Sequence, residues 1–236
     1  MNPINLFCLP FAGGNKYSYR AYEDNTSAKL KILTIEYPGR GERIKEPLIT
    51  NMEGLVADSF KRIKPLIKGM PYAIYGHSMG GLVAYLLCRK IFDTTGMIRP
   101  LQLFITGTVG PVCQAKKGIK RHLLPKSQFV EEIRSLDGCP EEVLGNDEIL
   151  DYFEPILRAD FRVSETYQYI KEEPLNLPVT VITGTEEDML AEEIESWQSE
   201  TTQSIEFSRM PGKHFFILNY PGELLRTFSR KLMLTN

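Results

Sequence analysis

The 236-residue sequence is poor in the residues that build metal sites and disulfide frameworks. It contains three histidines and four cysteines, and no two of Cys8, Cys88, Cys113 and Cys139 are close enough to form a C-x-x-C pair. Such pairs are the usual sequence sign of a structural zinc site or a redox motif. We therefore expect no metal site, and we expect reduced, partly buried thiols of a cytoplasmic protein.

Long apolar runs and an excess of charge of one sign are also absent. No run approaches the ~18 apolar residues of a membrane helix, and residues 1–8 lack the basic start of a signal peptide. Lysine plus arginine number 28 and aspartate plus glutamate 30, so the net charge is -2. This even balance gives no support to a nucleic acid or a membrane as partner. The 42% of hydrophobic residues excludes a disordered chain.

Six short runs, mostly apolar or β-branched, predict strands. They cover residues 4–9, 31–37, 72–75, 101–106, 179–183 and 205–210. Their lack of polar alternation suits strands that are covered on both faces, as in a parallel sheet. Helical patterns lie between them, over residues 52–67 and 82–91, and a third follows the last strand at 224–232. Strands that alternate with helices predict an α/β fold.

The segment between the fourth and fifth predicted strands is too long for a simple connection. A crossover between parallel strands needs only about a dozen residues, whereas residues 107–178 separate these two strands. Residues 127–135 and 146–158 within it are predicted to be helical. We expect a single domain over residues 1–236, with residues 112–169 as an inserted helical cap at the carboxyl edge of the sheet.

The sequence Gly76-His77-Ser78-Met79-Gly80 follows the third predicted strand and opens a helix. This is the G-x-S-x-G nucleophile elbow in its strand–turn–helix context. The glycines are needed because the serine occupies a strained turn in which backbones crowd. We predict an α/β-hydrolase fold, a mostly parallel sheet flanked by helices, with Ser78 as the nucleophile. The alternative is an ordinary glycine-rich turn.

A serine nucleophile needs a histidine base that is oriented by a carboxylate. His77 lies inside the elbow and should point away from Ser78, and His122 lies in a basic stretch that resembles solvated surface. His214 follows the last predicted strand, in the chain order Ser…Asp/Glu…His of the hydrolases. We predict His214 as the base; the alternative is a core histidine beside two phenylalanines.

The triad acid and the oxyanion hole are predicted from chain position. Glu186, Glu187 and Asp188 are consecutive after the fifth predicted strand, so the acid is ambiguous. We favour Asp188, with Glu187 as the alternative. The two backbone N–H donors of an oxyanion hole are expected at Met79, directly after the nucleophile, and at Ala12, in the loop after the first strand.

Further motifs cover nearly the whole chain. They are CLPFAGG at 8–14, YPGRGER at 37–43, GHSMGG at 76–81, PILRADF at 155–161, ETY at 165–167 and PGKHFF at 211–216. With these motifs the chain resembles the type II thioesterases, stand-alone α/β-hydrolases that serve nonribosomal peptide and polyketide synthases. Ser78, His214, Ala12 and Met79 fall on the family's nucleophile, base and oxyanion positions, and Asp188 falls in the segment that supplies its acid.

The resemblance implies a serine hydrolase that removes acyl groups from the phosphopantetheine arm of carrier proteins, to edit stalled carriers. It implies acyl or peptidyl carrier protein domains as partners and requires no cofactor. Three alternatives stay open: release of genuine biosynthetic intermediates, hydrolysis of free small esters, and a non-catalytic relative that only binds.

Two interpretations are open for several residues of the cap. Phe129, Phe153 and Leu157 either line an acyl channel or, as we favour, pack the core of the cap. Arg158 and Asp160 are expected to form structural ion pairs between cap and core rather than to border the pantetheine path. The basic run Lys116-Lys117-Gly118-Ile119-Lys120-Arg121 either docks acidic carrier proteins or is a solvated loop.

Overall fold

The computed structural model describes residues 3–27, 29–67, 69–116, 118, 120–136, 138 and 141–234. Within these residues, six strands form one wholly parallel sheet in the order β2-β1-β3-β4-β5-β6. The strands are β1 (Ile4–Leu9), β2 (Leu30–Thr34), β3 (Tyr72–His77), β4 (Leu103–Thr106), β5 (Val179–Gly184) and β6 (Glu206–Met210). The six predicted strands are therefore confirmed, with bounds that differ by up to three residues.

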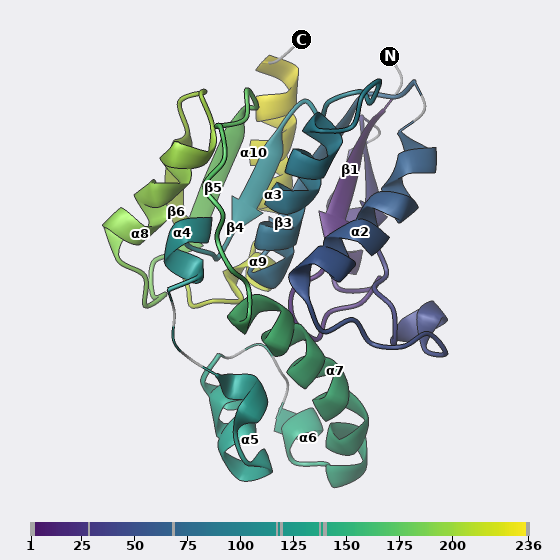
Figure 1. Cartoon of the computed structure of the whole chain (residues 1–236), viewed down its shortest axis with the longest axis vertical. Coiled ribbons are helices and arrows are strands. Elements are labelled where there is room, and N and C mark those ends of the chain that lie inside the picture. Colours follow the sequence, from purple (N-terminus) through teal and green to yellow (C-terminus); the bar gives the residue numbers. More distant parts are fainter. Residues whose placement is uncertain are drawn as a thin grey trace.

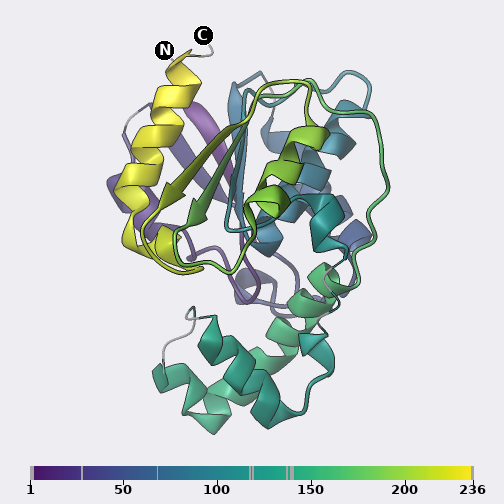
Figure 2. The same ribbon diagram turned by 90° about the vertical axis from the view of Figure 1, so that its left-hand side faces the viewer.

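Helices cover both faces of the sheet (Figures 1 and 2). One face carries α2 (Met52–Ile63), α3 (Met79–Phe92) and α8 (Ala191–Glu195), and the other carries α1 (Arg20–Asn25), α9 (Phe216–Asn219) and α10 (Pro221–Leu234). Alternate residues of β1 enter two separate cores, Phe7 with the first helices and Leu6 and Cys8 with the second. Because both faces of β1 and of β3 to β5 are buried, these strands are largely apolar. The edge strand β6 is mostly exposed and carries Glu206 and Arg209.

The remaining described α-helices lie between β4 and β5. They are α4 (Pro111–Gln114), α5 (Lys126–Ser135), α6 (Glu141–Leu144) and α7 (Asp147–Glu165). α5 and α6 lie beside α7 beyond the carboxyl ends of the strands (Figure 1). A small core of Phe129, Ile133, Leu144 and Leu150 holds these three helices together. The two predicted helices are present, and α7 continues past Arg158 to Glu165.

Candidate active site

Ser78 lies in the sharp turn between β3 and α3. Its φ of 55° and ψ of -123° make it the one non-glycine residue with positive φ in the described part of the chain. A Cβ atom on Gly76 would lie 2.0 Å from the carbonyl oxygen of Gly80, and one on Gly80 would lie 2.2 Å from that of Leu9. Both positions therefore exclude any side chain, which explains the G-x-S-x-G pattern.

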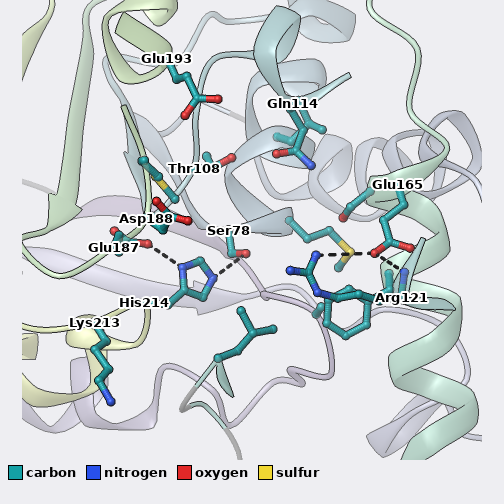
Figure 3. A pocket seen from close by; sticks show the side chains of 18 of the residues that line it. Ser78, Thr108, Gln114, Arg121, Glu165, Glu187, Asp188, Glu193, Lys213 and His214 are labelled. Atoms are coloured by element: carbon teal, nitrogen blue, oxygen red, sulfur yellow. Dashed lines mark hydrogen bonds and ion pairs between the residues drawn. The ribbon is translucent and has the colours of Figure 1, made fainter. Parts of the chain in front are cut away.

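A chain of hydrogen bonds runs from Ser78 through His214 to Glu187 (Figure 3). The distance from His214 Nε2 to Ser78 Oγ is 2.9 Å, and that from His214 Nδ1 to Glu187 Oε1 is 2.6 Å. The Glu187 side chain is 2% exposed, whereas that of His214 is 18% exposed. His214 thus faces the solvent-accessible cleft, and the Glu187 carboxylate lies behind it.

The prediction that Asp188 pairs with His214 is wrong, because Glu187 occupies that place. The backbone N–H of Gly184, at the end of β5, donates to Glu187 Oε2 at 2.6 Å and so leaves Oε1 for the histidine. The chain turns directly afterwards, with the N–H of Met189 bonded to the Glu187 carbonyl oxygen. Asp188 is therefore directed into the cleft, where it is exposed.

The two predicted oxyanion donors lie beside the serine. Met79 is the first residue of α3, and the first N–H groups of a helix have no partner within the helix. Ala12 follows β1, and both residues line the cleft that contains Ser78 and His214. The structure thus brings together Ser78, His214, Ala12 and Met79, as the sequence analysis predicted.

The two other histidines are not part of this chain of hydrogen bonds. His77 is fully buried, with Nδ1 3.0 Å from Thr106 Oγ1 and its ring centroid 4.8 Å from that of His214. Burial, with a smaller contribution from His214, lowers the pKa of His77 well below its ordinary value. The expectation of a solvated His122 is wrong, since its side chain is 10% exposed and lies 2.6 Å from Glu165.

Two cavities meet at Ser78. The larger, of ≈ 640 Å³, is an open cleft with a mixed polar and apolar lining, whose polar residues include Thr108, Gln114 and Asp188 (Figure 3). The smaller, of ≈ 60 Å³, extends from Ser78 beneath the inserted helices and is mostly apolar. Its lining includes Phe11, Ala12, Ile133, Leu136, Leu157, Phe161 and Phe215. Of the three cap residues discussed above, Leu157 lines this pocket and also packs against the cap core, and Phe129 lies in that core. Phe153 makes an edge-to-face contact with Tyr152.

Comparison with known proteins shows the family. The sequence matches the thioesterase domain over residues 4–232. The chain belongs to the thioesterase family. This confirms the predicted class of enzyme, a hydrolase.

Relatives of this thioesterase come from biosynthetic pathways for peptides and polyketides. It is 34% identical to the gramicidin S biosynthesis protein GrsT of Aneurinibacillus migulanus, covering 98% of this chain and 90% of that protein. The crystal structure of ClbQ from the colibactin NRPS/PKS pathway matches with a TM-score of 0.92 at 31% identity, covering 99% and 98% of the two chains. The type II thioesterase BorB from the borrelidin biosynthetic cluster matches with a TM-score of 0.87 at 28% identity, covering 98% and 93%. These matches confirm the resemblance to type II thioesterases and the α/β-hydrolase fold.

Sequence reasoning missed the partner of Asp160 in this thioesterase. Asp160, on α7, forms a two-pronged ion pair with Arg40 in the loop after β2. The expected ion pair between cap and core is thus present for Asp160. It is wrong for Arg158, whose side chain bonds to Glu154 of the same helix and to the carbonyl oxygen of His122. Arg40 stands in the YPGRGER motif, but no local pattern marks a partner so distant in sequence.

Other features of the thioesterase bear on metals and membranes. Among the described residues, no group of three or more histidine, cysteine, aspartate or glutamate side chains is arranged to hold a metal ion. Cys8, Cys88 and Cys113 are free thiols, and Cys139 lies outside the described residues. In the part of the chain that the structure describes, no helix has both the length and the apolar character to span a membrane.

Proposed function

We propose that this thioesterase hydrolyses acyl groups from the phosphopantetheine arm of acyl or peptidyl carrier protein domains of nonribosomal peptide or polyketide synthases, to edit stalled carriers. The observation that carries the proposal is the hydrogen-bonded chain Ser78–His214–Glu187 at the meeting point of the two cavities. The pathway is supported by the relatives, which are named for gramicidin S, colibactin and borrelidin biosynthesis.

The first half-reaction transfers the acyl group to Ser78. His214 Nε2 takes the hydroxyl proton while Ser78 Oγ attacks the thioester carbonyl carbon. The N–H groups of Ala12 and Met79 stabilise the negative oxygen of the tetrahedral intermediate. The carbon–sulfur bond then breaks, and the sulfur of the pantetheine arm leaves with the proton from His214.

The second half-reaction releases the acid. His214 takes a proton from water, which attacks the acyl-serine carbonyl, and the proton then returns to Ser78 Oγ as the ester bond breaks. Glu187 holds the Nδ1 proton of His214 and stabilises the imidazolium that forms in each half. Every group in this scheme belongs to the chain, the substrate or water, so the proposed reaction uses no cofactor.

The two cavities suggest how the substrate lies. We assign the ≈ 60 Å³ apolar pocket to the acyl group. The ≈ 640 Å³ cleft has many more polar groups in its lining, and we assign it to the amide-containing pantetheine arm. Residues 112–169 then act as the cap over the site within a single domain, since α5 and α7 supply one wall of the pocket. A small pocket favours short acyl groups, which suits removal of stalled short chains rather than release of a long product.

The partner and location complete the proposal. In the predicted docking run, Arg121 is paired with Glu132 and Glu165, and Lys117 lies outside the described residues. Lys116 and Lys120 are the cations in this run that we assign to carrier docking. We place the reaction in the cytoplasm, where free thiols such as Cys113 stay reduced.

The test is serine-dependent deacylation of a carrier. Purified protein and its Ser78→Ala variant are incubated with acetyl-, medium-chain- and aminoacyl-loaded carrier proteins, and the carrier mass is followed. We expect loss of the acyl mass with the unaltered protein only, fastest for acetyl. Turnover of simple oxygen esters without carrier deacylation would instead make the protein a free-ester hydrolase. A preference for long, mature acyl chains would instead indicate that the enzyme releases the product rather than edits stalled carriers.

A further inference from the structure

The buried pair of Arg40 and Asp160 lies next to the loop that carries Ala12. Asp160 is 1% exposed and Arg40 3% exposed. The guanidinium donates twice to the carboxylate, at 2.6 Å from Nη1 to Oδ2 and 2.7 Å from Nη2 to Oδ1. Removing two charges from water costs several kcal/mol per ion, and apolar replacements are often as stable. Stability alone therefore gives a weak reason for this pair.

Both members of the pair also bind the loop after β1. Asp160 Oδ2 accepts the N–H of Gly13 at 2.7 Å, and Arg40 Nη1 donates to the carbonyl oxygen of Gly14 at 3.1 Å. α7 itself presses on the same loop, since a Cβ atom on Gly13 would lie 2.5 Å from Leu157 Cδ2. The loop is therefore held by a helix far away in sequence, since Asp160 follows Gly13 by 147 positions.

The loop held in this way is a tight turn with Ala12 at its centre. The N–H of Gly14 bonds to the carbonyl oxygen of Phe11 at 2.9 Å, and Gly13 has a φ of 77°. This combination is that of a type II turn, in which glycine is favoured at the third position. The N–H of Gly13 belongs to the central peptide of the turn. A charge-assisted bond to that peptide fixes the turn type and hence the place of Ala12 beside Ser78.

We propose that Asp160, held by Arg40, is a positioning residue for the oxyanion hole: it fixes the turn that presents the Ala12 N–H to the reacting carbonyl. The inference rests on the proposed function, in which Ala12 is an oxyanion donor. The cap helix then contributes to catalysis without touching the substrate, since α7 must be seated for the Ala12 turn to be held.

The test removes both charges together, because a single deletion would leave an unpaired buried charge that costs several kcal/mol. The variant is Arg40→Met with Asp160→Leu, and its matched control is Arg158→Met with Glu154→Leu, which removes another ion pair of α7. Three quantities are compared: kcat and KM for the acetyl-loaded carrier, the same constants for p-nitrophenyl acetate, and the inhibition constant of butylboronic acid. Boronic acids form a tetrahedral adduct on the serine that places an oxygen in the oxyanion hole.

We expect kcat of the Arg40/Asp160 variant to fall 10- to 100-fold, less than the 10²–10³ measured for complete loss of a donor. KM should change by less than about threefold, and boronate binding should weaken about tenfold or more. The control should keep all three within about twofold. A purely structural pair would lower thermal stability without this selective loss, so a folded variant with unchanged kcat and boronate affinity would overturn the inference.

Two further arms separate the possible failures. If the double variant does not fold, the single variant Asp160→Asn tests the role of Asp160 instead. We expect it to lose fivefold or more in kcat and in boronate affinity, and unchanged values would reject the role. If the unaltered protein hydrolyses p-nitrophenyl acetate but no carrier, the proposed substrate fails, while the ester and boronate comparisons still judge Asp160. Absence of any boronate binding by the unaltered protein would reject the oxyanion hole and the role together.

Discussion

At the scale of single residues, the carboxylate behind His214 shows how one position changes chemistry. Glu187 and Asp188 are adjacent in sequence and both carry a carboxylate. The Gly184 N–H, however, holds Glu187 so that its Oε1 is directed at His214. Asp188 faces the open cleft. A base is effective only when its second nitrogen is held in the correct tautomer, so the two carboxylates should differ greatly in importance.

We predict that Glu187→Gln lowers kcat by about 10³–10⁴, because an amide favours the wrong tautomer of the histidine. The matched change Asp188→Asn should leave kcat within about threefold. Steady-state kinetics with the acetyl-loaded carrier checks both. Equal losses in the two variants would contradict the assignment of Glu187 as the triad acid.

At the scale of elements, the turn between β3 and α3 depends on glycine for steric reasons. The atom that an added Cβ would meet at Gly76 is a backbone oxygen 2.0 Å away, which cannot move aside as a flexible side chain does. We expect Gly76→Ala to lower the free energy of unfolding by about 3 kcal/mol or more, measured by urea denaturation.

A suitable control for that change is Gly118→Ala, since none of the described residues has an atom within 4 Å of a Cβ at that position. Its effect should stay within about 0.5 kcal/mol. If Gly76→Ala were as mild as Gly118→Ala, close packing of β3 against α3 would not be the reason for the glycine.

The helix α7 sets the depth of the apolar pocket. Phe161 lines both cavities and Leu157 lines the smaller one, each on the face of α7 that is turned toward Ser78. We predict that Phe161→Ala raises the hexanoyl-to-acetyl ratio of kcat/KM about tenfold or more, because added room for methylenes is worth roughly 1–3 kcal/mol.

Competition assays with acetyl- and hexanoyl-loaded carriers measure that ratio directly. Tyr152→Ala is the matched control, since Tyr152 is an aromatic residue of α7 that is half exposed and lines neither cavity. A similar shift in both variants would indicate loosening of α7 rather than a larger acyl pocket.

At the scale of the whole molecule, a series of buried hydrogen bonds connects the site to the core that lies under α1, α9 and α10. His77 bonds to Thr106, Thr106 to Tyr75, Tyr75 to Tyr22, and Tyr22 to the carbonyl oxygen of Ile217. These residues belong to the strands β3 and β4 and the helices α1 and α9. The hydrogen bonds around His77 therefore form only when the two strands and the two helices are packed together.

Burial of His77 predicts a dependence of stability on pH. Its pKa is lowered on folding, so the unfolded chain binds a proton near pH 6.5 that the folded chain does not bind. This contribution to stability is complete above pH 6.5 and is lost as the pH falls toward 5. Below pH 6.5 the free energy of unfolding should therefore fall less steeply with decreasing pH in His77→Gln than in the unaltered protein. We expect the two slopes to differ by up to about 1 kcal/mol per pH unit.

Urea denaturation at several pH values between 5 and 7.5 gives the slopes for the two proteins. Only the slopes are compared, because the substitution also alters the stability at neutral pH. Parallel curves for the unaltered protein and His77→Gln would mean that this histidine does not govern acid sensitivity.

Local patterns alone determined the class of fold and singled out Ser78 and His214, which the structure brings to hydrogen-bond distance. The inner strands are largely apolar because both faces of the sheet are covered there, and the elbow is a strand–turn–helix motif whose steric demands act within a few residues. His214 could be identified because few histidines exist and only one follows the last strand. Each of these inferences depends on neighbours in sequence, which a single chain displays directly.

Only the tertiary structure decided which carboxylate meets His214, which residue meets Asp160, and which residues line the apolar pocket. Glu187 is selected by where the turn after β5 directs its side chain, and Arg40 pairs with Asp160 across 120 positions of the chain. The pocket is walled by residues from the loop after β1, the helices α5 and α7, and the loop before α9. Such contacts arise where distant segments pack together, and packing depends on the shape of the whole chain rather than on any local pattern.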